Sequence, residues 1–402
     1  MKSKLALAAL AAVVVVGTAL AGSQDTPGVT STTILIGGTA PLSGEASSAG
    51  NVARGADAYF KWINSHGGVN GRQITYKYED DAYDPARTVQ AVRELVQQDQ
   101  VFAIFNTLGT DNNLAVRDFL NQMGVPQVFS ASGAALLGTD YKKYPWTIGY
   151  IPSYLLEGNV LARQALKTKP TAKIAVLYQD DEYGHELVTG LKKGLGAKQK
   201  QLVAAVGYDP TAADVQSEVA QLKASKADTL MIFAFGKYSV QAFVDANKLG
   251  WHPQVYVNAV ASSASLMTIA SLTAGKKETT GAVSIVYFKD PTDPRWAKDP
   301  GLALFRTILK AYDPSANPQD GYYGAGMASA FTLVDALRKA GKDLTRDSLM
   351  KAVLSLKETN NPFVIPGITI ATSPTDHFPM QQVGLQRWNG TNWVGLPGIV
   401  SG

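Results

Sequence analysis

The chain has 402 residues, a formal net charge of +4 and no cysteine. The lack of cysteine excludes disulfides, thiolate metal sites, a cysteine nucleophile and attachment of a lipid through cysteine. Basic residues are scattered, with no stripe of the kind that binds nucleic acid, so we expect no nucleic-acid partner.

The first residues have the pattern of an export signal. Lys2 and Lys4 precede an unbroken apolar run at 5–16, and Ala19 and Ala21 are the small residues of a cleavage site. The run is shorter than the about 20 residues that a membrane span needs. We therefore expect 1–21 to be a cleaved signal peptide and the mature protein to be periplasmic and not a lipoprotein.

From residue 33 onward, apolar strands alternate with amphipathic helices. The expected strands are 33–38, 74–80, 101–105, 125–129, 173–178, 201–206, 229–235 and 254–258. The expected helices are 52–65, one beginning near Pro85, 112–123, 155–167, 184–195, 214–225 and 238–249. The alternation predicts βαβ units, and its restart after Pro152 predicts two doubly wound α/β lobes with parallel sheets.

The last part of the chain breaks this rhythm. A strand is expected at 281–288, a turn-rich loop at 289–294, and helices at 302–311, 323–339 and 345–356. A hairpin is expected at 383–394, turning at Asn389-Gly390. These elements must pack on sheets that are already begun, so we expect the chain to cross between the lobes more than once.

The sequence offers little evidence of a catalytic site. The four histidines lie beyond helical reach of one another, and the chain has no P-loop and no G-x-S-x-G motif. Acidic residues follow expected strands at 79–81 and 180–182, where carboxylates more often cap the next helix than catalyse. We expect no enzyme, cofactor or metal; an exported hydrolase that uses Asp80, Asp81 or Asp180 is the alternative.

Three loops rich in Gly, Ser and Thr follow expected strands, at 43–50, 108–111 and 130–133. Each lies beside a helix N-terminus, where free N–H groups and the helix dipole favour an anion. Thr110 and Ser132 add hydroxyls, although such residues can also serve only as N-caps. Three such loops in one lobe, without catalytic groups, favour binding of a small molecule.

Four segments carry a resemblance to a known family. The stretches 36–44, 67–72, 80–85 and 178–184 resemble, in this order, bacterial periplasmic leucine/isoleucine/valine-type binding proteins. The resemblance covers essentially the whole chain after residue 21. It implies a type I periplasmic binding protein fold, with two doubly wound Rossmann-like lobes joined by a three-crossing hinge. It also implies that lobe one comprises 32–149 and 282–375, and lobe two 150–281 and 376–402.

The same resemblance implies the ligand site. In the family, the loops that match 108–110 and 130–132 hold the α-carboxylate and α-ammonium of the ligand, and Thr110 and Ser132 stand where hydroxyls are expected. Tyr183 and Phe235 match aromatic positions of the pocket, with ordinary core as the alternative. The full expected set is Ser43, Ala49, Leu108, Gly109, Thr110, Ser130, Ala131, Ser132, Tyr183, Phe235 and Ala259.

One position departs from the family pattern. Amino-acid-binding members carry a carboxylate where this chain has Ala259, and burying an unpaired ammonium is costly. We therefore expect a small carboxylate or amide with an apolar or aromatic body. A branched-chain amino acid stays open if Asp180, Asp181 or another acid reaches the site.

The resemblance also implies partners and a mechanism. The ligand would be captured by lobe closure and passed to the permease and ATPase subunits of an ABC importer, with the binding protein a monomer. The alternative is a soluble sensor lobe that presents its ligand to a membrane receptor.

Overall fold

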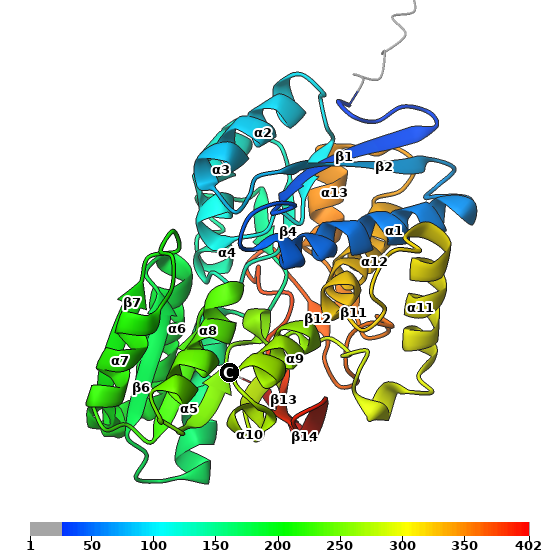
Figure 1. Ribbon diagram of the computed structural model, residues 1–402. Coiled ribbons are helices and arrows are strands. Elements are labelled where there is room, and N and C mark those ends of the chain that lie inside the picture. Colours follow the sequence, from blue (N-terminus) through cyan, green and yellow to red (C-terminus); the bar gives the residue numbers. More distant parts are fainter. Residues whose placement is uncertain (1–25, 402) are drawn as a thin grey trace, which may run out of the picture.

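A computed structural model describes residues 26–401 of the chain, and the expected signal peptide lies outside these residues. Two α/β lobes face each other, one drawn above the other in Figure 1. Within residues 26–401, no helix combines the length and the apolar character that crossing a membrane requires.

The first lobe is built on a five-stranded parallel sheet of order β2-β1-β3-β4-β5. Its strands are β1 (Thr33–Ala40), β2 (Gln73–Asp80), β3 (Ala103–Phe105), β4 (Gln127–Ser130) and β5 (Thr147–Gly149). The helical segments between them are η1 (Ser47–Gly50), α1 (Asn51–Ser65), α2 (Pro85–Gln97), α3 (Thr110–Gln122) and α4 (Leu136–Thr139). α2 and α3 cover one face of the sheet and α1 the other, which is the doubly wound arrangement that the alternating pattern predicts.

The second lobe repeats this strand order in its own sheet, β14-β13-β10-β9-β8-β6-β7. Its parallel strands are β6 (Ile174–Gln179), β7 (Leu202–Tyr208), β8 (Thr229–Phe233), β9 (Gln254–Val257) and β10 (Val283–Val286). Its helical segments are α5 (Tyr154–Thr168), α6 (Glu182–Leu195), η2 (Gly196–Gln201), α7 (Gln216–Ala224), α8 (Lys237–Lys248), η3 (Ala259–Ala261), α9 (Ala264–Thr273) and α10 (Lys276–Thr279). Successive residues of β6 belong to different hydrophobic clusters, so helices cover both faces of this sheet as well.

The C-terminal elements are divided between the lobes. η4 (Pro294–Trp296), α11 (Pro300–Tyr312), α12 (Gly321–Ala340) and α13 (Arg346–Val353) return to the first lobe, where α12 packs along α1. A small sheet pairs β11 (Lys357–Glu358) with β12 (Ile370–Ala371). The hairpin of β13 (Gln382–Trp388) and β14 (Trp393–Ser401) adds to the second sheet, antiparallel to β10.

The pairing of β10 corrects one expected boundary. The family resemblance implies that the chain returns to lobe one at residue 282, but Val283 pairs with Tyr256 of β9 and with Arg387 of β13. β10 is therefore the fifth parallel strand of the second sheet, as β5 is of the first, and the crossing follows it. The chain passes between the lobes after β5, after β10 and before β13, so the hinge has three crossings.

Candidate functional site

A cleft lies between the carboxyl ends of the two sheets. It holds a cavity of about 140 Å³ and is lined from both lobes and from the crossing segments. In each sheet the strand order reverses next to the first strand, at β1/β3 and at β6/β8. Ligands of open α/β sheets bind outside such switch points, so the position of the cleft follows from the topology.

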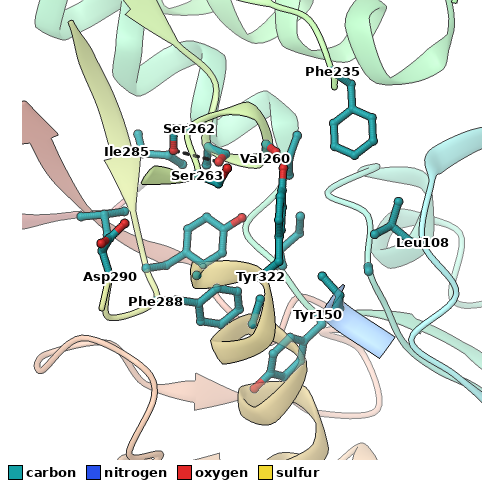
Figure 2. A pocket seen from close by; sticks show the side chains of 18 of the residues that line it. Leu108, Tyr150, Phe235, Val260, Ser262, Ser263, Ile285, Phe288, Asp290 and Tyr322 are labelled. Atoms are coloured by element: carbon teal, nitrogen blue, oxygen red, sulfur yellow. Dashed lines mark hydrogen bonds between the residues drawn. The ribbon is translucent and has the colours of Figure 1, made fainter. Parts of the chain in front are cut away.

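Eight of the 25 residues that line the cleft are aromatic. The aromatic residues that line it are Tyr83, Tyr150, Tyr154, Tyr183, Phe235, Tyr287, Phe288 and Tyr322. Figure 2 shows Phe235 and Leu108 on the opposite side of the space from Ile285 and Phe288, with the ring of Tyr322 between them. Such a surface suits an apolar or aromatic ligand body.

Two aromatic side chains that the sequence analysis singled out reach the cleft from the switch point of the second sheet. Tyr183 follows β6, and its hydroxyl donates a hydrogen bond of 3.1 Å to the Ala234 carbonyl. Phe235 follows β8 and packs against Tyr83 of the first lobe, with the rings tilted by 30° and their centroids 5.1 Å apart. Both are buried, as core residues are, and both also line the cavity.

The two glycine- and serine-containing loops of the first lobe meet at the cleft. Leu108, Gly109 and Ala131 line it directly. Gly109 precedes α3 with φ 108°, a conformation that favours glycine, and the loop can therefore turn sharply into the helix.

Thr110 and Ser132 lie just behind this wall. Both are buried, and their hydroxyl oxygens are 2.8 Å apart, so one hydroxyl donates to the other. Tyr154 lines the cleft near them; burial raises the pKa of Tyr154, and the neighbouring Gly133, Thr110 and Ser132 partly oppose the rise. The hydroxyl-bearing residues Thr110, Ser132 and Tyr154 thus lie near one another, at the loops where the sequence analysis expects the carboxylate of the ligand.

Five expected residues do not line the cleft: Thr110 and Ser132, described above, and Ser130, Ala49 and Ser43. The Ser130 hydroxyl is buried and has no hydrogen-bond partner among residues 26–401. Ala49 is buried within η1, and the Ser43 hydroxyl donates to Asp80 at 2.5 Å. Asp80 also accepts from the backbone N–H groups of Leu42 and Ser43, so Asp80 holds this loop.

The acidic residues of the alternative hydrolase have structural partners. Asp81 accepts from the Tyr83 N–H at 3.0 Å and from the Thr88 hydroxyl at 2.9 Å. Asp180 pairs with His185 at 2.8 Å on the exposed surface. None of these acids lines the cleft, and no group of three metal-ligating side chains occurs within residues 26–401.

Ala259 lines the cleft, and an acid that the sequence analysis did not name lies against it. Glu157 is in the first turn of α5, is 2% exposed, and accepts the Ala259 N–H. Burial raises the pKa of Glu157 to about 8, and the Ala259 hydrogen bond opposes the rise. The local sequence shows only that Glu157 lies on the buried face of a helix. It does not show the partner of Glu157, because Ala259 is 102 residues away in the chain.

Asp290 is the one acid and Lys289 the one cation among the described residues that line the cleft. Burial raises the pKa of Asp290 to about 6, against hydrogen bonds from the Thr292 hydroxyl and N–H. The Lys289 ammonium lies 2.9 Å from each carboxylate oxygen of Asp299, so its charge is already balanced.

The lobes touch each other around the cleft. Glu186 of α6 accepts the Ala135 N–H of the first lobe at 2.7 and 2.9 Å, and burial raises its pKa to about 7. The Lys237 ammonium lies 3.0 Å from Glu45, and the Tyr322 hydroxyl donates to Val260 at 2.8 Å. The structure is therefore a closed arrangement of the two lobes.

Comparison with known proteins places most of the chain in one protein family. Residues 33–392 match a family described as periplasmic binding protein. A Leu/Ile/Val-binding protein homolog of Brucella suis is 27% identical over 234 residues, which are 56% of this chain and 58% of that protein. A second homolog, from Brucella melitensis, is matched over 55% of its length, so the alignments span little more than half of these relatives.

Solved structures share the fold. A branched chain amino acid ABC transporter protein of Thermus thermophilus with bound valine has a TM-score of 0.79 and 18% identity, covering 92% of this chain and 96% of that one. A solute binding protein of R. palustris in complex with benzoate has a TM-score of 0.75 and 17% identity, again covering 92% and 96%. At these identities the likeness concerns the fold alone.

Proposed function

Because the chain belongs to the periplasmic binding protein family, of the leucine/isoleucine/valine-binding type, we propose that it is the extracytoplasmic solute-binding component of an ABC importer. It acts in the periplasm as a monomer and delivers its solute to a membrane permease that is driven by an ATPase. The aromatic cleft between the carboxyl ends of the two sheets is the observation that carries this proposal.

The proposed solute is small, with an apolar or aromatic body and a carboxylate or amide, or it is a branched-chain amino acid. The cavity of about 140 Å³ is close to the size of one that holds benzene, about 150 Å³. Thr110, Ser132 and Tyr154 supply hydroxyls at one end, and the aromatic rings cover the body. The bound valine and benzoate of the two solved structures fall in these classes.

In the proposed mechanism the first lobe binds the solute and the second lobe closes over it. A solute closes the protein only by binding the closed form more tightly than the open one. Moving the equilibrium from 1:99 to 99:1 takes about 5.5 kcal/mol of that preference. The contact of Phe235 with Tyr83 and the pairing of Lys237 with Glu45 join the two lobes in the closed form.

The proposal is tested by thermal shifts of protein that has been unfolded and refolded to remove bound solute. Branched-chain amino acids, aromatic carboxylates and short amides are each added in excess. A ligand at about 100 times its Kd adds about 2.7 kcal/mol of stability, which shifts the melting temperature measurably. A hit in any of the three sets supports solute capture, whereas no shift in any set, or turnover of a compound, contradicts it.

A further inference from the structure

Glu186 joins the two lobes at a point outside the cleft. It lies in α6 of the second lobe, is 7% exposed, and is not among the described residues that line the cavity. Both of its carboxylate oxygens accept the Ala135 N–H of the first lobe, at 2.9 and 2.7 Å. Ala135 is the N-cap of α4, and no side chain of its own lobe caps that helix. The second lobe therefore supplies an acceptor that the first lobe lacks.

The segment that Glu186 contacts also belongs to a loop of the proposed solute site. The Ser132 hydroxyl accepts the Ala134 N–H at 3.1 Å and shares a hydrogen bond of 2.8 Å with Thr110. Residues 132–135 are thus held by Ser132 at one end and by Glu186 at the other. When the lobes separate, Glu186 loses its contact with Ala135 and its carboxyl is left to water.

Other acids gather at the same junction between the lobes. Glu182 lies one turn before Glu186 on α6, and Asp181 caps this helix by accepting the Gly184 N–H at 3.1 Å. Asp111, in the first turn of α3, approaches from the first lobe, where the backbone of Glu182 and the charge of His185 act on it. Closure therefore brings carboxyls of the two lobes together.

The charged groups on the elements packed around Glu186 do not neutralise it. His185 of α6 pairs with Asp180, and Arg117 of α3 pairs with Asp140 at 3.3 Å, at the end of α4. α5, which packs along α6, contributes the acid Glu157 and the exposed cations Arg163 and Lys167. No cation of residues 26–401 forms an ion pair with Glu186, so its negative charge is poorly compensated in the closed form.

Burial consequently raises the pKa of Glu186 to about 7, against the N–H groups of Ala135 and Leu136 and with the help of Glu182. The pKa of Asp181 is likewise raised by burial, to about 6, and the charge of Asp111 adds to the rise. Exposure to water in the open form returns a carboxyl toward its ordinary pKa. A pKa that is higher in the closed form favours closure at low pH, and this contribution is lost as the pH rises through 7.

We propose that Glu186 couples closure of the lobes to the uptake of a proton, so that the closed form gains at mildly acidic pH and weakens as the pH rises above neutral. The proposal rests on the lobe closure of the proposed function and adds a control to it. Glu186 is a positioning residue in this account, because it holds the loop of Ser132 without contacting the solute.

The test measures the distance between the lobes in refolded protein without solute. The chain has no cysteine, so Ser48→Cys on η1 and Lys248→Cys on α8, both exposed, carry the only two spin labels. Pulsed electron paramagnetic resonance then gives the populations of the short and long distances. A pKa that moves from 4.5 to about 7 on closure predicts a closed-to-open ratio about 20-fold higher at pH 5.5 than at pH 7.5.

Two substitutions in the labelled protein separate Glu186 from a general effect of pH. Glu186→Gln keeps an oxygen that accepts the Ala135 N–H but has no proton to take up, so the ratio should change only about 2- to 3-fold over the same range. Glu218→Gln is the matched control, because Glu218 is an exposed carboxyl on α7 of the same lobe. It should reproduce the wild-type dependence on pH.

A second readout is the affinity of unlabelled protein for L-valine and for benzoate, neither of which changes its charge between pH 5.5 and pH 7.5. The wild-type affinity should rise toward pH 5.5 in parallel with the closed population, and calorimetry in two buffers should show proton uptake on binding near pH 6. Glu186→Gln should reduce both the pH dependence and the uptake.

The outcomes separate this proposal from the proposed function. A distance distribution that does not change with pH, or an equally steep dependence in Glu186→Gln, overturns the role of Glu186, and binding of either compound would leave solute capture standing. Failure of both compounds to bind counts against the proposed solute classes, whereas the distances, measured without solute, still decide the role of Glu186.

Discussion

At the scale of single residues, the hydroxyls at one end of the cleft have the role that a substitution can test most directly. Thr110 and Ser132 share one hydrogen bond, and the Tyr154 hydroxyl adds a third group. A carboxylate that accepts from these hydroxyls gains charge-assisted hydrogen bonds, which are about twice as strong as neutral ones. The solute carboxylate is therefore expected to depend on Thr110.

Replacing Thr110 tests this dependence. Thr110→Val keeps the shape of the side chain but removes the hydroxyl, and it should weaken binding of a carboxylate-bearing solute about 10-fold or more. Thr110→Ser keeps the hydroxyl and should stay near the wild-type affinity. Calorimetric titration of both variants gives the comparison; full affinity in Thr110→Val would remove the carboxylate role.

Local sequence identified the parts of the site that stand beside a strand end or helix start. Leu108, Gly109 and Ala131 directly follow strands, and Tyr183 and Phe235 follow the two strands at the switch point of the second sheet. Glu157 and Tyr322 escaped prediction because their partners, Ala259 and Val260, come from distant parts of the chain. Ser43 does not line the cleft, and its hydroxyl donates to Asp80 instead, a contact that the local sequence does not reveal.

At the scale of elements, helix periodicity and caps were visible in sequence, while sheet partners were not. The expected strand at 281–288 exists as β10, yet only its pairing with β9 and β13 places it in the second sheet. The residues of β10 itself do not indicate which strands it pairs with. The hairpin turn at Asn389-Gly390 was predictable, because Gly390 has φ 92° and a turn there requires that conformation.

The packing of α12 on α1 depends on close approach at a glycine. A Cβ on Gly326 would lie 1.9 Å from the Val52 carbonyl oxygen, whereas the nearest atom to a Cβ on Gly324 is a Phe305 carbon at 3.8 Å. Gly326→Ala should therefore cost about 1–3 kcal/mol of stability or more. Gly324→Ala should be neutral or gain up to about 1 kcal/mol through helix propensity.

Urea unfolding of the two variants measures the difference. Both glycines are buried in the same helix, so a general effect of the added methyl group would appear in both. Equal stability of Gly326→Ala and Gly324→Ala would show that the helices separate freely and would contradict the packing described here.

At the scale of the whole molecule, several buried acids make stability depend on pH. Burial raises the pKa of Glu157 to about 8 and those of Glu186 and Glu358 to about 7, from an ordinary value of 4.5. Between the ordinary pKa of 4.5 and the raised pKa of each acid, the folded protein keeps a proton that the unfolded protein has released. The contribution of these three acids to stability is therefore fully present below the unfolded pKa and is lost as the pH rises toward 8.

The slope of this decline is measurable. Each such proton contributes up to about 1.4 kcal/mol per pH unit, so solute-free protein should unfold at higher urea concentration at about pH 5.5 than at about pH 7.5. Glu358→Gln removes one titrating group and should make the slope shallower. A stability that increases over this range would contradict the protonation states inferred for the buried acids.

Closure of the two lobes is the central claim at this scale, and small-angle X-ray scattering tests it most directly. Refolded, solute-free protein is measured alone and then saturated with the compound that gives the largest thermal shift. We predict a smaller radius of gyration with the compound, and a scattering curve that fits the closed lobes joined through Glu186 and Ala135. Identical curves for the free and saturated protein would contradict capture by closure.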